Sequence, residues 1–396
     1  MARGIRCATA TNDPSMPSSH HLLNIGPLAL HSGRVLPDVQ LAYATYGQLS
    51  ARGDNAILVT HGYTASHALL AHGSGVAEGS WAPLIGPRRP LDPERFFIVC
   101  PNMLGSCYGS TGPASIDPAT GRLYGGQFPD ITFGDIVASQ YALLQRLGVT
   151  HLRAVVGPSM GGFQALQWAV DHPRFVDVAA AIVSSTHLPP HDSMQLPALR
   201  ALIERDPQWN NGAYAPGALH AALQRLRVDT LTTYGMREVL AAQGLAPAEV
   251  QARIERMAAA WAREFDPYSL IVLLRAALAF DVRPRLGAIE ADTLIAVARS
   301  DALFPPDDAV RTHLAATRGA SRYLVMDTPF GHAASGPAHT LWGGEFARLL
   351  GDQRGGAGHV ARLGLAGEHG AGGRRAKGQQ RGAGAGVGEL GAGLLE

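Results

Sequence analysis

The residues best suited to chemistry are a serine in a glycine-flanked turn and the acid and histidine that follow it. The segment 157–161 reads Gly-Pro-Ser-Met-Gly; it follows the apolar run 153–156 and precedes a stretch with helical spacing. A G-x-S-x-G motif between a strand and a helix sets the serine hydroxyl at a sharp turn above the sheet. The context predicts that Ser159 is a nucleophile. A glycine-rich helix start without a catalytic role is the alternative.

A serine hydroxyl is a weak nucleophile at neutral pH, so it needs a base, which an acid must orient. Asp301 follows the apolar run 293–298, and His332 follows the run 323–326. This is the chain order of serine, acid and histidine that accompanies such a turn. Because parallel strands end at one edge of a sheet, we expect the three side chains to meet there. Asp327 is a rival acid, but it lies on the loop of His332 itself. An ordinary loop histidine is the alternative for His332.

An oxyanion needs two backbone N–H groups, one from the residue after the nucleophile and one from the loop after an early strand. Met160 fills the first position. The loop 61–64 follows the apolar run 56–60 and supplies the second N–H through Tyr63. We expect His61 to brace this loop rather than to act as a second base.

The elements that must position these residues alternate along the chain. Short runs typical of buried, mostly parallel strands occur at 56–60, 96–100, 153–156, 178–183, 293–298 and 323–326. Stretches with helical spacing lie between them, at 131–147, 162–171 and 306–317. The alternation predicts an α/β fold with a mostly parallel sheet and helices on both faces. We expect this core to span residues 21–185 and 286–352.

Three further segments differ from the core. Residues 186–285 contain helical segments but no convincing strand, which predicts a helical lid inserted over the strand ends. Residues 1–20 are expected to be a flexible leader. The glycine-rich segment 353–396 is expected to be a disordered tail, because it cannot bury enough apolar surface to offset its ordering entropy.

Composition excludes several function classes. Of 396 residues, 46% are hydrophobic, enough for a sizeable core, and the formal net charge of +1 offers no basic field for nucleic acid or a membrane surface. No membrane-spanning run or signal peptide is evident, so we expect a cytoplasmic protein. Cys7, Cys100 and Cys107 are too few for a disulfide framework or a structural zinc site, and no metal is expected.

Several segments resemble signature segments of the homoserine O-acetyltransferases, a family of acyltransferases with the α/β-hydrolase fold. They are NMLGSCYGSTGPAS at 102–115, GPSMGGFQALQW at 157–168, DALFPP at 301–306, and shorter matches at 128–132, 206–209 and 265–267. The resemblance extends from about Leu22 to Leu350. It implies an α/β-hydrolase fold and assigns Ser159, Asp301 and His332 as nucleophile, acid and base.

The resemblance also implies the reaction. In that family Ser159 would take an acyl group, here acetyl, from acyl-CoA and pass it to a small hydroxylated acceptor, a step of amino-acid (methionine) biosynthesis. Acyl-CoA would be a co-substrate, with no tightly bound cofactor or metal. Arg200, six residues before Asp206, matches the arginine that contacts the substrate carboxylate. The lid would form a homodimer contact; a monomer with a mobile cap is the alternative.

Departures from the family pattern concern the acceptor. The family carries an acidic residue directly after the catalytic histidine, where it holds the amino group of homoserine, and this chain has Ala333. The oxyanion loop and Ala302 differ as well. We therefore expect homoserine to be a weak acceptor and a related hydroxylated molecule to be used. An esterase that uses water is the alternative function, and a non-catalytic relative is opposed by the intact set of three residues.

Overall fold

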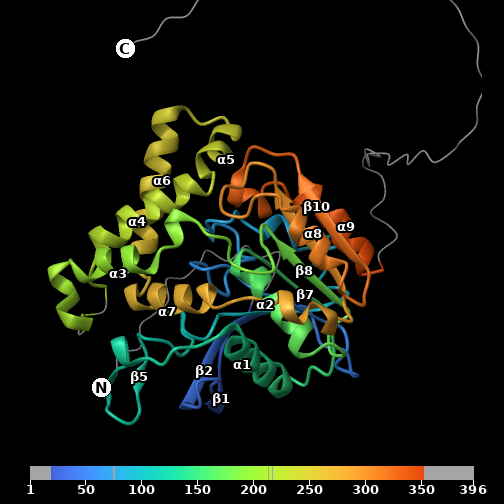
Figure 1. The fold of residues 1–396 in the computed structure, drawn as a ribbon, viewed down its shortest axis with the longest axis horizontal. Helices are drawn as coiled ribbons and strands as arrows, with labels where there is room; N and C mark the ends of the chain where they lie inside the picture. The colour runs from blue at the N-terminus through green and yellow to red at the C-terminus, as the bar shows by residue number, and fades with distance from the viewer. Residues whose placement is uncertain (1–18, 75, 213, 216, 352–396) are drawn as a thin grey trace, which may run out of the picture. The chain divides into compact units, whose positions relative to one another are not determined.

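An eight-stranded sheet runs through the part of the chain that this computed structural model describes, residues 19–351 without 75, 213 and 216 (Figure 1). The strand order is β1-β2-β4-β3-β7-β8-β9-β10. The strands are β1 (Ser19–Ala29), β2 (Val35–Tyr46), β3 (Ala56–Val59), β4 (Phe97–Pro101), β7 (Leu152–Pro158), β8 (Val178–Ile182), β9 (Asp292–Ala298) and β10 (Ser321–Met326). A separate hairpin pairs β5 (Ile116–Asp117) with β6 (Arg122–Leu123).

The six strands from β4 to β10 in this order are parallel, as the sequence predicts, and each of the six predicted runs is a strand. The antiparallel pair β1 and β2 was not predicted. β1 contains Gly26 and Pro27 and has two register irregularities, and β2 contains Pro37, so neither strand shows a clean β pattern in the sequence. β1 begins at Ser19, inside the expected leader 1–20. The rest of that leader and the expected tail 353–396 lie outside the described residues.

The parallel strands are apolar throughout because both faces of the sheet are covered. Along β3, Ala56 and Leu58 belong to one buried cluster, whereas Ile57 and Val59 belong to another. The first cluster includes helices α1 (Phe133–Arg146) and α2 (Met160–Asp171), and the second includes α9 (Gly343–Leu349). The sheet is therefore the middle layer, which confirms the predicted arrangement of helices on both faces.

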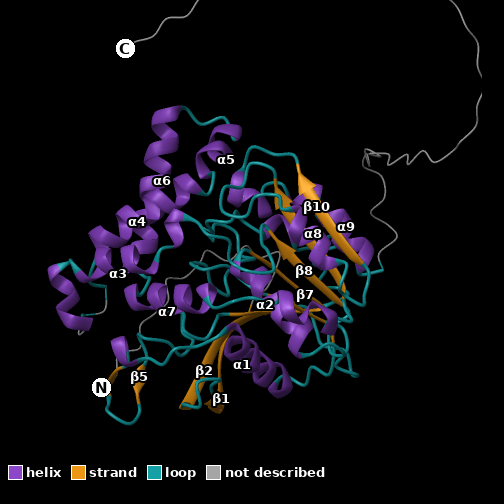
Figure 2. Cartoon of the chain, in the orientation of Figure 1, coloured by secondary structure: helices purple, strands orange, loops and turns teal. Residues whose placement is uncertain are grey.

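The described residues between β8 and β9 form helices and connecting turns but no sheet strand (Figure 2). The α-helices of this lid are α3 (Leu196–Glu204), α4 (His220–Thr233), α5 (Met236–Ala242), α6 (Pro247–Ala262) and α7 (Pro267–Leu278). In the core, α8 (Asp308–Leu314) precedes β10. Helices α3, α5 and α9 were not predicted; they have nine, seven and seven residues, and only α8 among the described α-helices this short coincides with a predicted stretch, 306–317.

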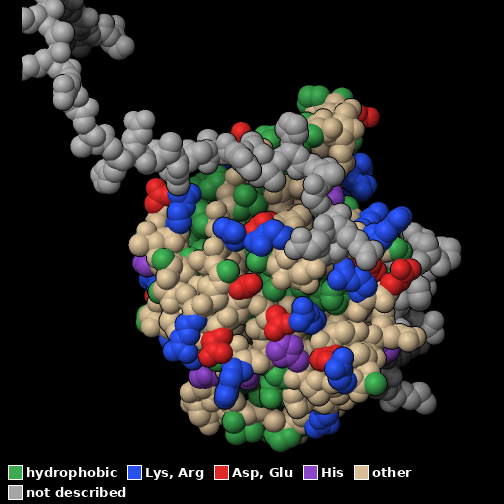
Figure 3. Space-filling view, turned by 90° about the vertical axis from the view of Figure 1, so that its right-hand side faces the viewer, with side chains coloured by type: hydrophobic (Ala, Val, Ile, Leu, Met, Phe, Trp, Pro, Cys, Tyr) green, Lys and Arg blue, Asp and Glu red, His purple; other side chains and the backbone are tan. Residues whose placement is uncertain are grey.

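The surface carries charges of both signs side by side, as the space-filling view of the β10 and α9 side shows (Figure 3). Ion pairs such as Arg322–Glu345 and Arg318–Glu290 lie on this part of the molecule. Among the described residues, no helix combines the length and the apolar character that crossing a membrane requires.

Candidate active site

The turn that carries Ser159 is strained and closely packed. Ser159 has φ +54° and ψ −123°, a conformation that non-glycine residues rarely adopt, and its N–H donates to the carbonyl of Ile182 at 2.9 Å. A Cβ atom on Gly157 or Gly161 would lie 2.3 or 2.5 Å from an oxygen of Thr60. Both glycines are needed because the backbone of the β3 loop passes against them, and the turn lifts Ser159 above the end of β7.

Asp301 and His332 meet beyond the ends of β9 and β10. His332 Nδ1 lies 2.9 Å from Asp301 Oδ2, and both side chains are fully buried. The other oxygen of Asp301 accepts from the backbone N–H groups of Leu303 and Phe304, at 2.9 and 3.1 Å. These bonds hold the carboxylate in place. A proton on Nδ1 shared with the carboxylate leaves the Nε2 atom of His332 as the basic nitrogen.

Two aromatic rings hold the imidazole of His332. The Tyr234 ring meets it edge-on with centroids 4.4 Å apart, and the Phe304 ring stacks on it at 5.3 Å. Phe304 in turn contacts Phe163, which lies one turn after Ser159 on α2. Nε2 of His332 is buried and has no hydrogen-bond partner among the described residues. The structure thus brings Ser159, Asp301 and His332 to the same edge of the sheet and leaves the basic nitrogen unoccupied.

The rival acid Asp327 is not part of this arrangement. Its side chain is 93% exposed and lies 3.8 Å from Arg299 in an ion pair. A shallow hollow of about 450 Å³ is lined by Asp327, Arg299 and Thr328 among others, on the outside of the loop that carries His332. Asp301 is therefore the acid that the geometry supports.

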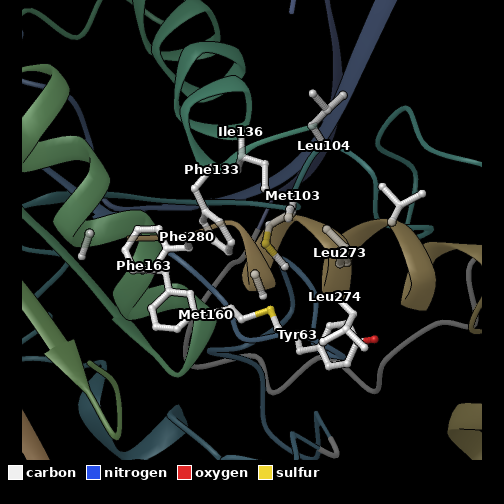
Figure 4. Close-up of a cluster of buried hydrophobic side chains, with 14 of the residues drawn as sticks. Tyr63, Met103, Leu104, Phe133, Ile136, Met160, Phe163, Leu273, Leu274 and Phe280 are labelled. Atoms are coloured by element: carbon white, nitrogen blue, oxygen red, sulfur yellow. The ribbon is translucent and has the colours of Figure 1, made fainter. Parts of the chain in front are cut away.

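The two expected oxyanion donors lie in one buried cluster (Figure 4). Neither Tyr63 nor Met160 donates its backbone N–H to another described residue. The Tyr63 hydroxyl donates to the carbonyl of Leu270 on α7, at 2.5 Å, so this loop is attached to the lid. On the other side, Gln164 Nε2 donates to the carbonyl of His61 at 3.0 Å, which joins the loop to α2.

His61 braces this loop, as expected from the sequence. Its Nδ1 is 2.8 Å from the carbonyl oxygen of Gly62, and its Nε2 accepts the N–H of Met103 at 3.0 Å. Burial lowers the pKa of His61 to about 4, so the ring is neutral at physiological pH. Both ring nitrogens are used in backbone contacts.

Arg200, the expected carboxylate anchor, is not brought to this site. Its side chain is 43% exposed on α3 and forms an ion pair with Glu204, one turn further along the helix. No hydrogen bond or ion pair of the described residues joins it to Ser159 or His332. The role of Arg200 therefore stays a prediction, and the side chain is half-exposed on α3.

Arg227 on α4 is a buried cation of the lid. Its guanidinium donates to Thr64 Oγ1 in the oxyanion loop and lies 4.9 Å over the ring of Trp261. Burial lowers the pKa of Arg227, and the carboxylate of Glu78 opposes this shift. Sequence analysis missed Arg227, although it lies on the apolar face of α4 with Leu223 and Leu231, at spacings of four residues. The available signal was an arginine at a position where the helical spacing predicts a buried apolar residue.

Glu78 is a second residue that the sequence analysis missed. It is fully buried, and burial raises the pKa of its carboxyl, while His332 and Arg227 act in the opposite direction. The segment around it, Gly-Val-Ala-Glu-Gly-Ser, has no periodicity and gives no signal. Glu78, Arg227 and His332 are all buried, and Glu78 and Arg227 contact the loop 61–64 at Gly62 and Thr64.

Comparisons with known proteins agree with this geometry. Residues 55–334 match the family model described as alpha/beta hydrolase fold. The homoserine O-acetyltransferase of Solidesulfovibrio magneticus is 47% identical over 196 residues, which are 48% of this chain and only 49% of that protein. The homoserine O-acetyltransferase of Bradyrhizobium diazoefficiens is 35% identical over 335 residues, which are 78% of this chain and 84% of that protein.

A solved structure extends the comparison to hydrolases. The acetylester hydrolase from Corynebacterium glutamicum has a TM-score of 0.72 and 27% sequence identity, over 84% of this chain and 96% of that chain. The same architecture is therefore found in a protein named for transfer and in one named for hydrolysis.

Proposed function

This chain belongs to the homoserine O-acetyltransferase family of the α/β-hydrolase fold, and from that premise we propose that it transfers an acetyl group from acetyl-CoA to a small hydroxylated acceptor through an ester on Ser159. The observation that carries the proposal is the Asp301–His332 pair, whose Nε2 has no hydrogen-bond partner among the described residues, at the sheet edge where Ser159 follows β7. No tightly bound cofactor is required.

In the first half-reaction, His332 Nε2 accepts the proton of Ser159 as the serine oxygen attacks the thioester carbonyl. The N–H groups of Tyr63 and Met160 stabilise the negative charge on the carbonyl oxygen. The C–S bond then breaks, the CoA sulfur takes the proton from His332, and the acetyl group remains on Ser159.

In the second half-reaction, His332 removes a proton from the acceptor hydroxyl, which attacks the acetyl ester. Breakage of the bond to Ser159 returns the proton to the serine oxygen. We assign the binding of an acceptor carboxylate to Arg227 rather than to Arg200, because Arg227 is buried beside the oxyanion loop. A guanidinium offers a carboxylate two parallel hydrogen bonds.

Hydrolysis is the second candidate, favoured by the likeness to an acetylester hydrolase. Water would then replace the acceptor on the same acetyl-enzyme. Exclusion of water favours transfer, and Ser159 and His332 are only 2% and 1% exposed. The closed site therefore supports transfer over hydrolysis.

The proposal is tested by mixing the protein with acetyl-CoA and locating the acetyl group by mass spectrometry. We expect a mass increase of one acetyl group on Ser159 and its loss when homoserine or another hydroxy amino acid is added. An acetyl group on a different residue would contradict the proposal. Loss of the group to water at the same rate with and without any acceptor would establish the hydrolase instead.

We also propose a homodimer formed through the lid, which rests on the resemblance, and a cytoplasmic location, which rests on the sequence patterns described above. Light scattering on the purified protein measures the first. A monomer at micromolar concentration would contradict it.

A further inference from the structure

Glu78 carries a buried carboxylate that the fold itself does not use. Both of its carboxylate oxygens lack a hydrogen-bond partner among the described residues, and the side chain is fully buried. The backbone at this position is well anchored: Ser335 Oγ donates to the carbonyl of Glu78, and Trp81 Nε1 donates to that hydroxyl at 2.9 Å. Burying a carboxylate without a hydrogen-bond partner lowers the stability of the folded protein, so a functional reason for Glu78 is expected.

The surroundings of the carboxylate place it at the candidate active site. A Cβ atom on Gly62, the residue before Tyr63, would lie 2.1 Å from Glu78 Oε1, so the carboxylate touches the oxyanion loop. A Cβ atom on Gly79 would lie 2.5 Å from the carbonyl oxygen of Ala333, so the backbone next to Glu78 touches the residue after His332.

The charges of His332 and Arg227 both lower the pKa of this carboxyl, against the effect of burial. The Arg227 guanidinium is engaged elsewhere, by Thr64 Oγ1 and the face of Trp261, and neither oxygen of Glu78 accepts a hydrogen bond from it. A structural ion pair therefore does not account for Glu78. Arg227 contacts the oxyanion loop at Thr64 and Glu78 contacts the same loop at Gly62, so a guanidinium and a carboxylate both border the loop 61–64.

We propose that Glu78 determines acceptor specificity by binding an ammonium group, while Arg227 binds the carboxylate of the same molecule. The inference rests on the proposed function and narrows it, because it makes the acceptor a hydroxylated α-amino acid. A carboxylate from a separate loop thereby replaces the acidic side chain that is absent at Ala333. Each oxygen left without a partner in the unliganded protein receives a charge-assisted hydrogen bond in the complex.

The test compares two acceptors that differ only in the ammonium group, homoserine and 4-hydroxybutyrate. A hydrogen bond between charged groups changes affinity by roughly tenfold to a hundredfold. We expect the unmodified protein to prefer homoserine in kcat/KM by at least about tenfold. In Glu78→Gln, which keeps the shape and removes the charge, the ratio of the two kcat/KM values should fall to about one.

Using a ratio separates recognition from chemistry, because any effect of Glu78 on His332 changes both acceptors equally. Glu94→Gln, the same substitution in the exposed loop before β4, is the matched control and should keep the ratio. An unchanged ratio in Glu78→Gln, an equal loss for both acceptors, or no preference in the unmodified protein would each overturn the inference.

A binding measurement keeps the test independent of turnover. Homoserine should raise the melting temperature of Ser159→Ala more than 4-hydroxybutyrate does, and adding Glu78→Gln should remove the difference. Equal shifts overturn the inference. If no ester forms on Ser159, the proposed function is contradicted. The melting temperatures of the Ser159→Ala variants do not depend on that ester, so they still test whether Glu78 binds the ammonium group. The melting temperature of Glu78→Gln without ligand shows whether it folds.

Discussion

The carboxyl edge of the sheet and the inner face of the lid both contribute to the site, but their residues are held in different ways. At the sheet edge, Ser159 and Asp301 are fixed by hydrogen bonds to neighbouring backbone groups. On the lid, the side chains of Arg227 and Tyr234 pack against the rings of Trp261 and His332, and the side-chain hydrogen bond of Arg227 goes to Thr64, in a loop outside the lid. The catalytic residues are thus held by short turns, whereas the proposed binding of the acceptor depends on how α4 packs over those turns.

This difference separates the reaction from the choice of acceptor. A turn keeps its geometry as long as its few local contacts remain. A helix face is shifted by any change in the helices around it, and α4 packs mainly against α6. Substitutions at the sheet edge should therefore affect every substrate, and those on the lid should affect some acceptors more than others.

Ser159→Ala is expected to have the largest effect. Removing the nucleophile should lower kcat by about a thousandfold or more for acetyl-CoA and for simple acetyl esters alike. The measurement is p-nitrophenyl acetate hydrolysis together with acetyl transfer. Ser50→Ala, at the opposite edge of the sheet, should retain the rate of the unmodified protein. A loss of rate with only one of the two substrates would contradict the expectation that substitutions at the sheet edge affect every substrate.

Acidification should destabilise the sheet edge through His61. Burial lowers the pKa of His61 to about 4, so the unfolded chain, with a pKa near 6.5, binds the proton first. The contribution of the neutral, buried His61 to the free energy of unfolding is fully present above pH 6.5. As the pH falls towards 4, about 3 kcal/mol of this free energy is lost.

Denaturant unfolding at pH 7 and pH 4.5 measures this loss. His61→Gln should show a smaller difference between the two pH values, and substitution of the exposed His220 by Gln should not change it. His67 acts in the same direction, since burial lowers its pKa to about 3. An equal difference in His61→Gln and the unmodified protein would show that His61 is not the cause.

Arg227→Leu and Arg200→Leu compare the two candidate anchors. Loss of the buried Arg227 should lower kcat/KM for a carboxylate-bearing acceptor by roughly tenfold to a hundredfold, mainly through KM. Arg200→Leu should change it by less than about threefold, because an exposed ion pair contributes little. A larger loss of kcat/KM in Arg200→Leu than in Arg227→Leu would instead identify Arg200 as the residue that binds the carboxylate. The rate of p-nitrophenyl acetate hydrolysis shows whether each variant keeps the sheet edge intact.

Gly161→Ala and Gly344→Ala should have the smallest effects, and of opposite sign. At Gly161 the new methyl group meets the carbonyl of Thr60 at 2.5 Å, so we expect a loss of about 1–3 kcal/mol in stability. At Gly344, on α9, no atom lies within 4 Å, and alanine should stabilise the helix by roughly 0.5–1 kcal/mol. Thermal melting checks both, and equal changes would contradict the packing argument for the turn.

The sequence alone determined the parallel core, the turn around Ser159 and the order of Asp301 and His332. These features are local: a strand, a turn and a helix leave their pattern in consecutive residues, and strand ends necessarily meet at one edge of a parallel sheet. The hairpin of β1 and β2 escaped prediction because Gly26, Pro27 and the bulges interrupt its pattern.

Only the tertiary structure decided which charged side chains reach the site. Arg200 and Arg227 both lie on helices of the lid, and the family resemblance selected Arg200, whose side chain is 43% exposed, rather than the buried Arg227. Burial of Arg227 follows from the packing of α4 on α6, the next long helix of the lid, and from the contact with Thr64, which lies 163 residues earlier in the chain. No sequence pattern indicates that Glu78 is buried at the site. Its carboxylate lies in an irregular segment, and only folding buries it against Gly62, where the removal of water makes an unpaired charge costly.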